Sequence, residues 1–170
     1  MNPEIRAFAS KTLINVVIET PKGRRNKYYF DQESCLFRLN KVLPAGATFP
    51  YDFGFVPGTR AEDGDPLDVL VLMDEPAFPG CLITARPIGV ITAEQREKGK
   101  MVRNDRVVAV ADKAHDYRHV RTLRDVGKHL VEELGYFFES YHKIRGSKFR
   151  VVGTHGARQA LAIVKDCLDR

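Results

Sequence analysis

A cluster of acidic residues directly before an apolar run is the feature that most constrains this chain. Asp63, Asp65 and Asp68 fall within six residues, and the apolar run 69–72 follows at once. The run predicts a buried β-strand, with Asp68 at its mouth and the other two carboxylates in the preceding turn. Three carboxylates aimed at one volume repel one another unless something positive lies between them.

A hard divalent cation such as Mg²⁺ fits that volume, because it prefers carboxylate oxygens and keeps some of its waters. A calcium-binding EF-hand is excluded: its sixth loop position needs glycine but is Asp68 here, and the fifth is Leu67, which cannot ligate. A solvated acidic turn without a ligand stays open from these residues alone.

Size and charge narrow the class of protein. The chain has 170 residues, which fits one domain over 1–170 that is large enough to bury a core. Hydrophobic residues make up 44% and charged residues 29%, as is typical of globular proteins. The net charge of +5 favours an anionic partner, either a phosphate compound or a nucleic acid.

The ends of the chain and its cysteines predict a cytoplasmic protein. Residues 1–6 lack the apolar run of a signal peptide, and no membrane-spanning apolar run is found, so no membrane association is expected. Cys35, Cys81 and Cys167 are odd in number and lack metal-ligand spacing. They are predicted to be buried free thiols in a reducing compartment.

Hydrophobic periodicity predicts many short strands followed by two helices. Pro87 and Gly89 predict an edge or a bulge in their strand. The pattern indicates an α+β fold, an antiparallel barrel with helices packed on it. Strands are expected at 12–20, 27–31, 36–42, irregularly within 49–58, and at 69–72, 81–92, 106–111 and 149–152; helices at 128–144 and 157–168; a helical turn at 123–126; and a charged surface loop at 94–99.

The acidic turn and its flanks resemble the soluble family I inorganic pyrophosphatases from about Val16 to Lys165. The shared motifs are VVIE at 16–19, KY at 27–28, FP at 49–50, DGDPLDVLV at 63–71, PG at 79–80, RPIGV at 86–90, VAV at 108–110 and FFESY at 137–141. The resemblance implies a five-stranded OB-like antiparallel barrel with additional strands and two packed helices. It also implies a homo-oligomer that hydrolyses pyrophosphate to two phosphates with several Mg²⁺ ions.

The resemblance also implies roles for individual residues. Asp63 and Asp68 would ligate metal. Asp65 would be the base beside the attacking water, and Glu19 would support the metal waters. Lys27 and Tyr141 would hold phosphate oxygens. These roles agree with phosphoryl transfer, in which positioning and charge stabilisation do most of the work.

Several positions depart from the family pattern. Tyr29 replaces a glutamate, and Phe53 replaces a tyrosine while keeping the ring. Lys41 replaces a phosphate-binding arginine and loses the bidentate fork. His142 replaces a lysine. Lys41 and His142 are still predicted to bind substrate.

The segment before Val107 departs most. Alignment puts Asn104 at a metal-binding aspartate and Arg106 at a lysine, while a further aspartate falls near Gly99, where there is no carboxylate. Strand alternation predicts that Asn104 and Arg106 share the site face and that Asp105 points away unless a bulge intervenes. We therefore expect Asn104 as a third metal ligand, Arg106 as a substrate-binding residue, and a weakened pyrophosphatase.

Two other functions remain open. The chain could hydrolyse another phosphate anhydride or ester, or it could be a non-catalytic binding module. In the second case the basic residues Lys22, Arg24, Arg25 and Lys27 on an OB-like barrel would hold phosphate or single-stranded nucleic acid. The acidic turn disfavours nucleic acid, because clustered carboxylates repel a phosphate backbone unless metal is bound. Plain structural roles are also possible: Tyr141 in the core, or Glu19 paired with Arg24 or Arg25.

Overall fold

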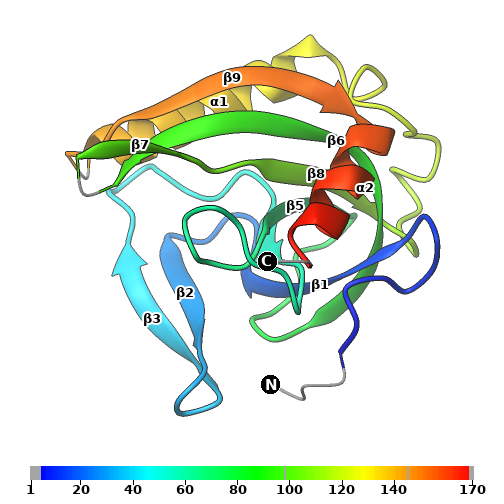
Figure 1. The fold of residues 1–170 in the computed structure, drawn as a ribbon, viewed down its shortest axis with the longest axis horizontal. Helices are drawn as coiled ribbons and strands as arrows, with labels where there is room; N and C mark the ends of the chain where they lie inside the picture. The colour runs from blue at the N-terminus through cyan, green and yellow to red at the C-terminus, as the bar shows by residue number, and fades with distance from the viewer. Residues whose placement is uncertain (1–4, 98, 145, 169–170) are drawn as a thin grey trace.

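The computed structural model describes residues 5–97, 99–144 and 146–168, and shows an α+β arrangement of a mixed sheet, a separate hairpin and two helices (Figure 1). The strands are β1 Ile14–Thr20, β2 Asn26–Asp31, β3 Leu36–Val42, β4 Asp52–Phe55, β5 Asp68–Leu72, β6 Leu82–Glu97, β7 Lys100–Arg103, β8 Arg106–Ala111 and β9 Phe149–Gly156; the helices are α1 Lys128–Ile144 and α2 Ala157–Asp166. Most of the predicted elements are therefore present.

The sheet is mixed, so the prediction of an antiparallel arrangement is wrong in one place. The strands pair in the order β1–β4–β5–β8–β6, and β6 pairs back to β1, which closes a ring of strand pairings. Every pair in this ring is antiparallel except β5–β8. Parallel neighbours need a crossover connection, and the segment 73–105, with β6 and β7, supplies it.

The long strand β6 agrees with its prediction in one respect and differs from it in two. The register shifts between Pro87 and Gly89, which confirms a bulge. The alternative of an edge strand is wrong, because β6 is hydrogen-bonded to β1, β7, β8 and β9. The predicted surface loop 94–99 is also wrong. β6 runs on to Glu97 and forms a hairpin with β7, in which Glu94 faces Arg103. The polar residues 94–97 gave no strand pattern in the sequence, because backbone pairing with β7 stabilises this part of β6.

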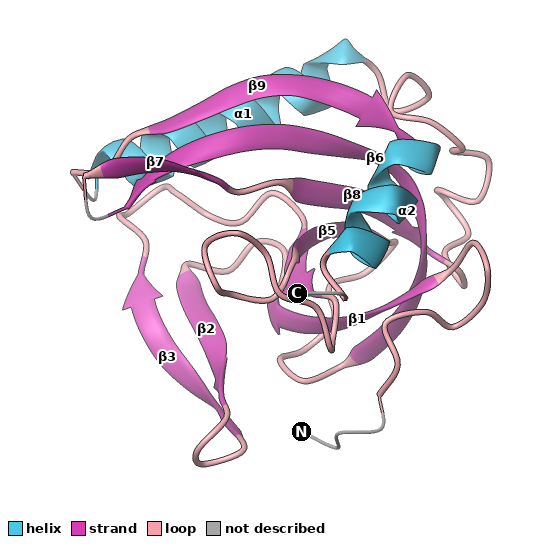
Figure 2. Ribbon diagram, viewed as in Figure 1, coloured by secondary structure: helices cyan, strands magenta, loops and turns pink. Residues whose placement is uncertain are grey.

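The helices lie on opposite sides of the strands that they cover. In Figure 2, α1 lies behind β9 and β6, whereas α2 lies in front of β6. α1 buries Leu130, Leu134 and Phe138, although Ile144 at its end is 62% exposed. The hairpin of β2 and β3 forms its own two-stranded sheet and projects at the lower left. Residues 123–126 form turns rather than the predicted helical turn, since the Asp125 carboxylate accepts the backbone N–H groups of Arg121 and Thr122.

Two of the three cysteines are less buried than predicted. Cys35, Cys81 and Cys167 form no disulfide, as predicted, but only Cys167 is buried, and Cys35 on the projecting hairpin is exposed. Within the described ranges, no helix is long and apolar enough to cross a membrane.

Candidate active site

The acidic turn is built by local hydrogen bonds. Gly64 has φ +90°, a conformation that favours glycine, and its N–H donates to the carbonyl of Ala61 at 3.1 Å. The N–H of Asp65 donates to Oδ1 of Asp63 at 3.1 Å. Leu67 is fully buried behind the turn, so the chain enters β5 with Asp68 as its first residue.

The parallel pairing of β5 with β8 brings Arg106 to Asp68. The two residues are register partners at the start of their strands, and Nη2 of Arg106 lies 3.5 Å from Oδ2 of Asp68. The Arg106 side chain is only 4% exposed. Its guanidinium carbon lies 4.1 Å from the ring centre of Phe138 and 4.6 Å from that of Phe149, which are favourable cation–π distances.

Strand alternation orients the residues before β8 as predicted. Nδ2 of Asn104 donates to Oδ2 of Asp63 at 2.7 Å, so Asn104 and Arg106 both reach the acidic residues. Asp105 points away from them, accepting from Nε of Arg103 at 2.7 Å and from the backbone N–H of Ala93 at 3.2 Å. Asp105 does not line the cavity that contains Asp63 and Asp68, and instead lines another with Glu62 and Leu67.

Gln95 is a site residue that the sequence did not reveal. Its Nε2 lies 3.4 Å from Oδ2 of Asp63, and the residue is buried on β6. The family alignment pointed to Gly99, which lies in the β6–β7 turn instead. Recognising that β6 continues through 94–97 would have found Gln95 by the alternation of side chains along a strand.

The hairpin places two lysines beside the aromatic residues of the core. Lys27 and Lys41 are cross-strand partners on β2 and β3. Nζ of Lys27 lies 5.0 Å from the ring centre of Phe53, and Nζ of Lys41 lies 5.2 Å from that of Tyr141. Their ammonium groups therefore face Phe53 and Tyr141, two aromatic residues of one cavity.

Tyr141 and His142 come from α1 and are both buried. The Tyr141 ring contacts Phe49 and stacks on Phe137, so it packs in the core, and it also lines the cavity described below. The His142 ring stacks on Phe149 at a centre-to-centre distance of 5.0 Å and an interplanar angle of 15°.

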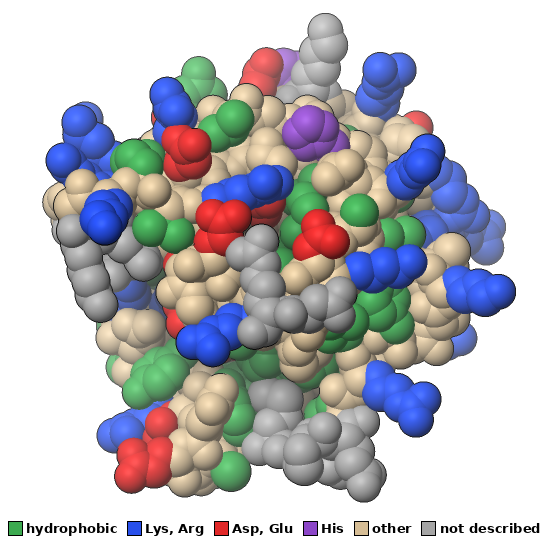
Figure 3. Space-filling model, viewed as in Figure 1, with side chains coloured by type: hydrophobic (Ala, Val, Ile, Leu, Met, Phe, Trp, Pro, Cys, Tyr) green, Lys and Arg blue, Asp and Glu red, His purple; other side chains and the backbone are tan. Residues whose placement is uncertain are grey.

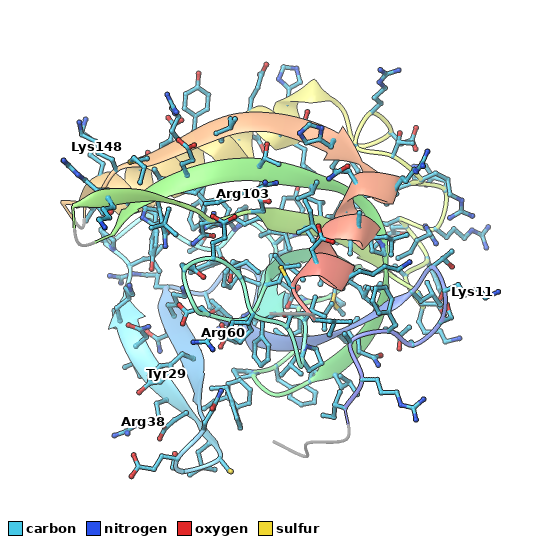
Figure 4. All side chains as sticks on the ribbon, viewed as in Figure 1. Lys11, Tyr29, Arg38, Arg60, Arg103 and Lys148 are labelled. Atoms are coloured by element: carbon cyan, nitrogen blue, oxygen red, sulfur yellow. The ribbon has the colours of Figure 1, made fainter. Side chains whose placement is uncertain are left out.

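These side chains enclose a cavity of about 190 Å³. It is lined by Lys27, Asn40, Lys41, Phe49, Phe53, Asp63, Asp65, Asp68, Gln95, Asn104, Arg106, Phe138, Tyr141 and His142. A second cavity of about 940 Å³ shares Lys27, Asp65 and Asp68 with the first and includes Glu19 and Tyr29. Tyr29 is on the projecting hairpin, as Figure 4 shows. Every residue predicted for the site therefore lines one or other cavity.

Glu19 reaches the second cavity from a bulge in β1. Ile18 pairs with Gly54 and Thr20 with Phe53, which leaves Glu19 as the extra residue, and bulges redirect side chains. A Cβ on Gly54 would lie 2.1 Å from the carbonyl oxygen of Val17, so only glycine lets β4 approach β1 here.

Glu19 is held by the backbone rather than by the arginines considered for it. Its Oε1 accepts the N–H of Phe30 at 3.0 Å, while Arg25 donates to the carbonyl of Leu43. Burial raises the pKa of Glu19 to about 7, and this effect is opposed by the charge of Lys27 and the hydrogen bond from Phe30.

Burial shifts the pKa of both members of the Asp68–Arg106 pair toward the neutral form. Burial raises the pKa of Asp68, and the charges of Arg106 and Lys27 oppose that shift. Burial likewise lowers the pKa of Arg106, against the effect of Asp68 and Asp63. An acidic turn facing lysine and arginine across a small polar cavity suits a protein that acts on a small phosphate compound.

Comparisons with known proteins agree with this site. The family model described as inorganic pyrophosphatase matches residues 16–170. The inorganic pyrophosphatase of Nostoc sp. is 43% identical over 152 residues, which cover 89% of this chain and 88% of that protein. That of Synechocystis sp. is 41% identical over 156 residues, covering 92% and 90%. The crystal structure of the Thermus thermophilus inorganic pyrophosphatase matches with a TM-score of 0.88 at 32% identity, covering 96% of this chain and 93% of that one.

The chain belongs to the inorganic pyrophosphatase family, which confirms the resemblance seen in the sequence. Membership implies a divalent metal cofactor. The described residues hold no cluster of three or more acidic, histidine or cysteine side chains placed to bind a metal. The available donors still fit one, because the carboxylates of Asp63, Asp65 and Asp68 and the amide of Asn104 line the same cavity and carry the hard oxygens that such ions prefer.

Proposed function

We infer that this chain hydrolyses inorganic pyrophosphate to two phosphates. The observation that carries this function is the cavity of about 190 Å³ in which Asp63, Asp65 and Asp68 meet Lys27 and Arg106. Lysine and arginine attract a small polyanion, and the carboxylates provide oxygens for a metal and a base for water. Family membership supports the same reaction.

We propose Mg²⁺ as the metal and assign Asp63, Asp68 and the amide oxygen of Asn104 to hold it. For Asn104 this requires the amide to turn, since its nitrogen now faces Asp63; the two ends of an amide are nearly isosteric. A bound Mg²⁺ supplies positive charge to the phosphates and lowers the pKa of water.

The side chains of the chain then have separate tasks. Asp65 takes the proton of the attacking water, and its carboxylate lines both cavities. Lys27, Lys41 and Arg106 bind phosphate oxygens and stabilise the charge that develops in the transition state. Tyr141 and His142 add donors from α1, and Glu19, held by the N–H of Phe30, orients water beside Asp65.

The departures from the family pattern predict slow turnover. Asn104 and Gln95 bring amides to Asp63, so the site has less negative charge for a metal. Each donor lost from the developing charge typically costs on the order of 10²–10³ in rate. We therefore propose a weakened pyrophosphatase, with hydrolysis of another phosphate anhydride or ester as the second candidate.

Finer features of the family also stay proposals. We propose that the closed ring β1–β4–β5–β8–β6 corresponds to the OB-like barrel, that the chain forms a homo-oligomer, and that it works in the cytoplasm.

Nucleic-acid binding is disfavoured. Lys27 faces Phe53 and Arg25 donates to the Leu43 carbonyl, and on the face in Figure 3 the Lys and Arg side chains are dispersed over the surface.

The test is phosphate release from pyrophosphate with and without Mg²⁺. We expect slow, Mg²⁺-dependent release, and a matched Asp65→Asn preparation should release phosphate at least about 10²-fold more slowly. Release from a nucleoside triphosphate but not from pyrophosphate would favour the second candidate. No release from any phosphate anhydride would overturn the proposed hydrolysis and leave a binding role.

A further inference from the structure

Two arginines near the start of β8 each pair with an aspartate, but in opposite surroundings. Arg103, labelled in Figure 4, is 47% exposed and bonds the buried Asp105 outside the active-site cavity. Arg106 is 4% exposed and pairs with Asp68 inside that cavity. Water therefore reaches the Arg103 side chain, whereas the protein encloses the Arg106 side chain.

Arg106 is fixed on several sides at once. Its Nη1 donates to the backbone carbonyl of Asn104 at 3.0 Å, and its guanidinium carbon lies over the rings of Phe138 and Phe149. The guanidinium therefore cannot swing away from Asp68 without giving up buried contacts. Its Nε has no hydrogen-bond partner among the residues that the structure describes, so the pair with Asp68 leaves donor capacity unused.

A second set of protein donors acts on Asp63. Nδ2 of Asn104 and Nε2 of Gln95 both approach its Oδ2, at 2.7 and 3.4 Å. The two carboxylates assigned to the metal are thus already engaged by the protein. Such donors satisfy a half-buried carboxylate that would otherwise carry part of a desolvation cost, and they engage an oxygen that a metal would use.

We propose that Arg106 is a resident counter-cation for Asp68, which holds this carboxylate in place without metal and limits metal affinity by competing for it. The proposal rests on the proposed function, because it takes Asp68 as a ligand for Mg²⁺. A fixed positive charge beside the ion lowers its affinity by Coulomb repulsion. Arginine suits this role, since it stays charged when buried and its planar group stacks on aromatic rings.

The test compares Arg106→Met with Arg103→Met in protein freed of metal by chelation. Methionine is unbranched and packs well against rings, so it can occupy the space beside Phe138 and Phe149 that the arginine fills. The readouts are the Tm in chelator, the rise in Tm with MgCl₂, and the Kd for Mg²⁺ from calorimetry. Both variants lose one positive charge, so only the position of that charge differs.

We expect Arg106→Met to lower the Tm without metal, because Asp68 loses its partner. The Mg²⁺-induced rise in Tm should exceed that of the wild type, and the Kd should fall on the order of tenfold. Arg103→Met should also lower the Tm, but its Kd should match the wild type. An unchanged or weaker Kd in Arg106→Met would overturn the proposal, as would an equal gain in Arg103→Met.

Further outcomes are also decisive. If Arg106→Met folds only when Mg²⁺ is added, the ion replaces the guanidinium and the proposal is supported. If Asp68→Asn with Arg106→Met fails to fold with or without Mg²⁺, Arg106 serves packing and the proposal fails. Absence of Mg²⁺ binding at millimolar concentrations in both proteins would also overturn it. None of these readouts uses pyrophosphate, so a missing hydrolytic activity would be a separate result.

Discussion

The two walls of the active-site cavity are made in different ways. The acidic wall, Asp63, Asp65 and Asp68, comes from one turn and the first residue of β5. The basic wall, Lys27, Lys41 and Arg106, comes from β2, β3 and β8. Local hydrogen bonds fix the first wall, and strand register and packing fix the second. The backbone that carries the carboxylates is thus shaped by a few neighbouring residues, whereas the positions of the cations depend on the whole fold.

The largest effect should come from the acidic wall, with Asp65→Asn. The amide keeps the shape but cannot take a proton from water, so hydrolysis should fall by about 10²–10⁴-fold. The Mg²⁺-induced rise in Tm should remain, because Asp63 and Asp68 are untouched. Phosphate release and thermal scans measure the two effects. A parallel loss of Mg²⁺ binding would show that Asp65 is a ligand.

The next effect concerns Glu19, which lines the second cavity. Its pKa of about 7 in the folded protein exceeds the ordinary value of 4.5. The unfolded chain therefore releases its proton first as pH rises from about 4.5 to 7, and stability falls over this window by at most on the order of 3 kcal/mol. At pH 8 in chelator, Glu19→Gln should thus be more stable than the wild type.

The Glu19 comparison should be made by urea unfolding over a pH series. The gain from Glu19→Gln should shrink toward zero near pH 4, where the wild-type carboxyl is protonated in both states. A gain that does not depend on pH would mean that burial does not govern this carboxyl.

A third prediction adds charge to the acidic wall through Asn104→Asp. A further carboxylate beside Asp63 should tighten Mg²⁺ binding on the order of tenfold and raise hydrolysis. Without metal the variant should be less stable, because the amide donor to Asp63 is replaced by a like charge. The control Asp105→Asn should leave the Kd for Mg²⁺ unchanged. It should still cost some stability, since Asp105 is buried and bonds Arg103. Loss of Mg²⁺ binding in the control, with no effect of Asn104→Asp, would reverse the assignment.

The smallest effect should come from the basic wall, with Lys41→Arg. A guanidinium can bind phosphate oxygens with two parallel hydrogen bonds, so KM for pyrophosphate should fall severalfold with little change in kcat. Lys41→Gln should raise KM instead. If both variants behave like the wild type in steady-state kinetics, Lys41 does not bind the substrate.

The sequence predicted locally determined features well and features that depend on long-range pairing poorly. The acidic turn and β5 were predictable because their residues are adjacent, and α1 because its apolar spacing is helical. The direction in which Asn104 and Asp105 point followed from simple alternation. The parallel β5–β8 pairing was not predictable, since it depends on a crossover far along the chain. Gln95 was missed because backbone pairing, which polar residues also allow, extends β6.

The contact of Arg106 with the rings of Phe138 and Phe149 also has a consequence for how the protein is made. The acidic turn is complete by residue 68, but the aromatic rings that hold its counter-charge come from α1 and β9. During synthesis, which proceeds from the N-terminus, the carboxylates are translated long before their partner is locked in place. Long-range closure of this kind is slow relative to local structure. The site is therefore among the last parts of the molecule to mature.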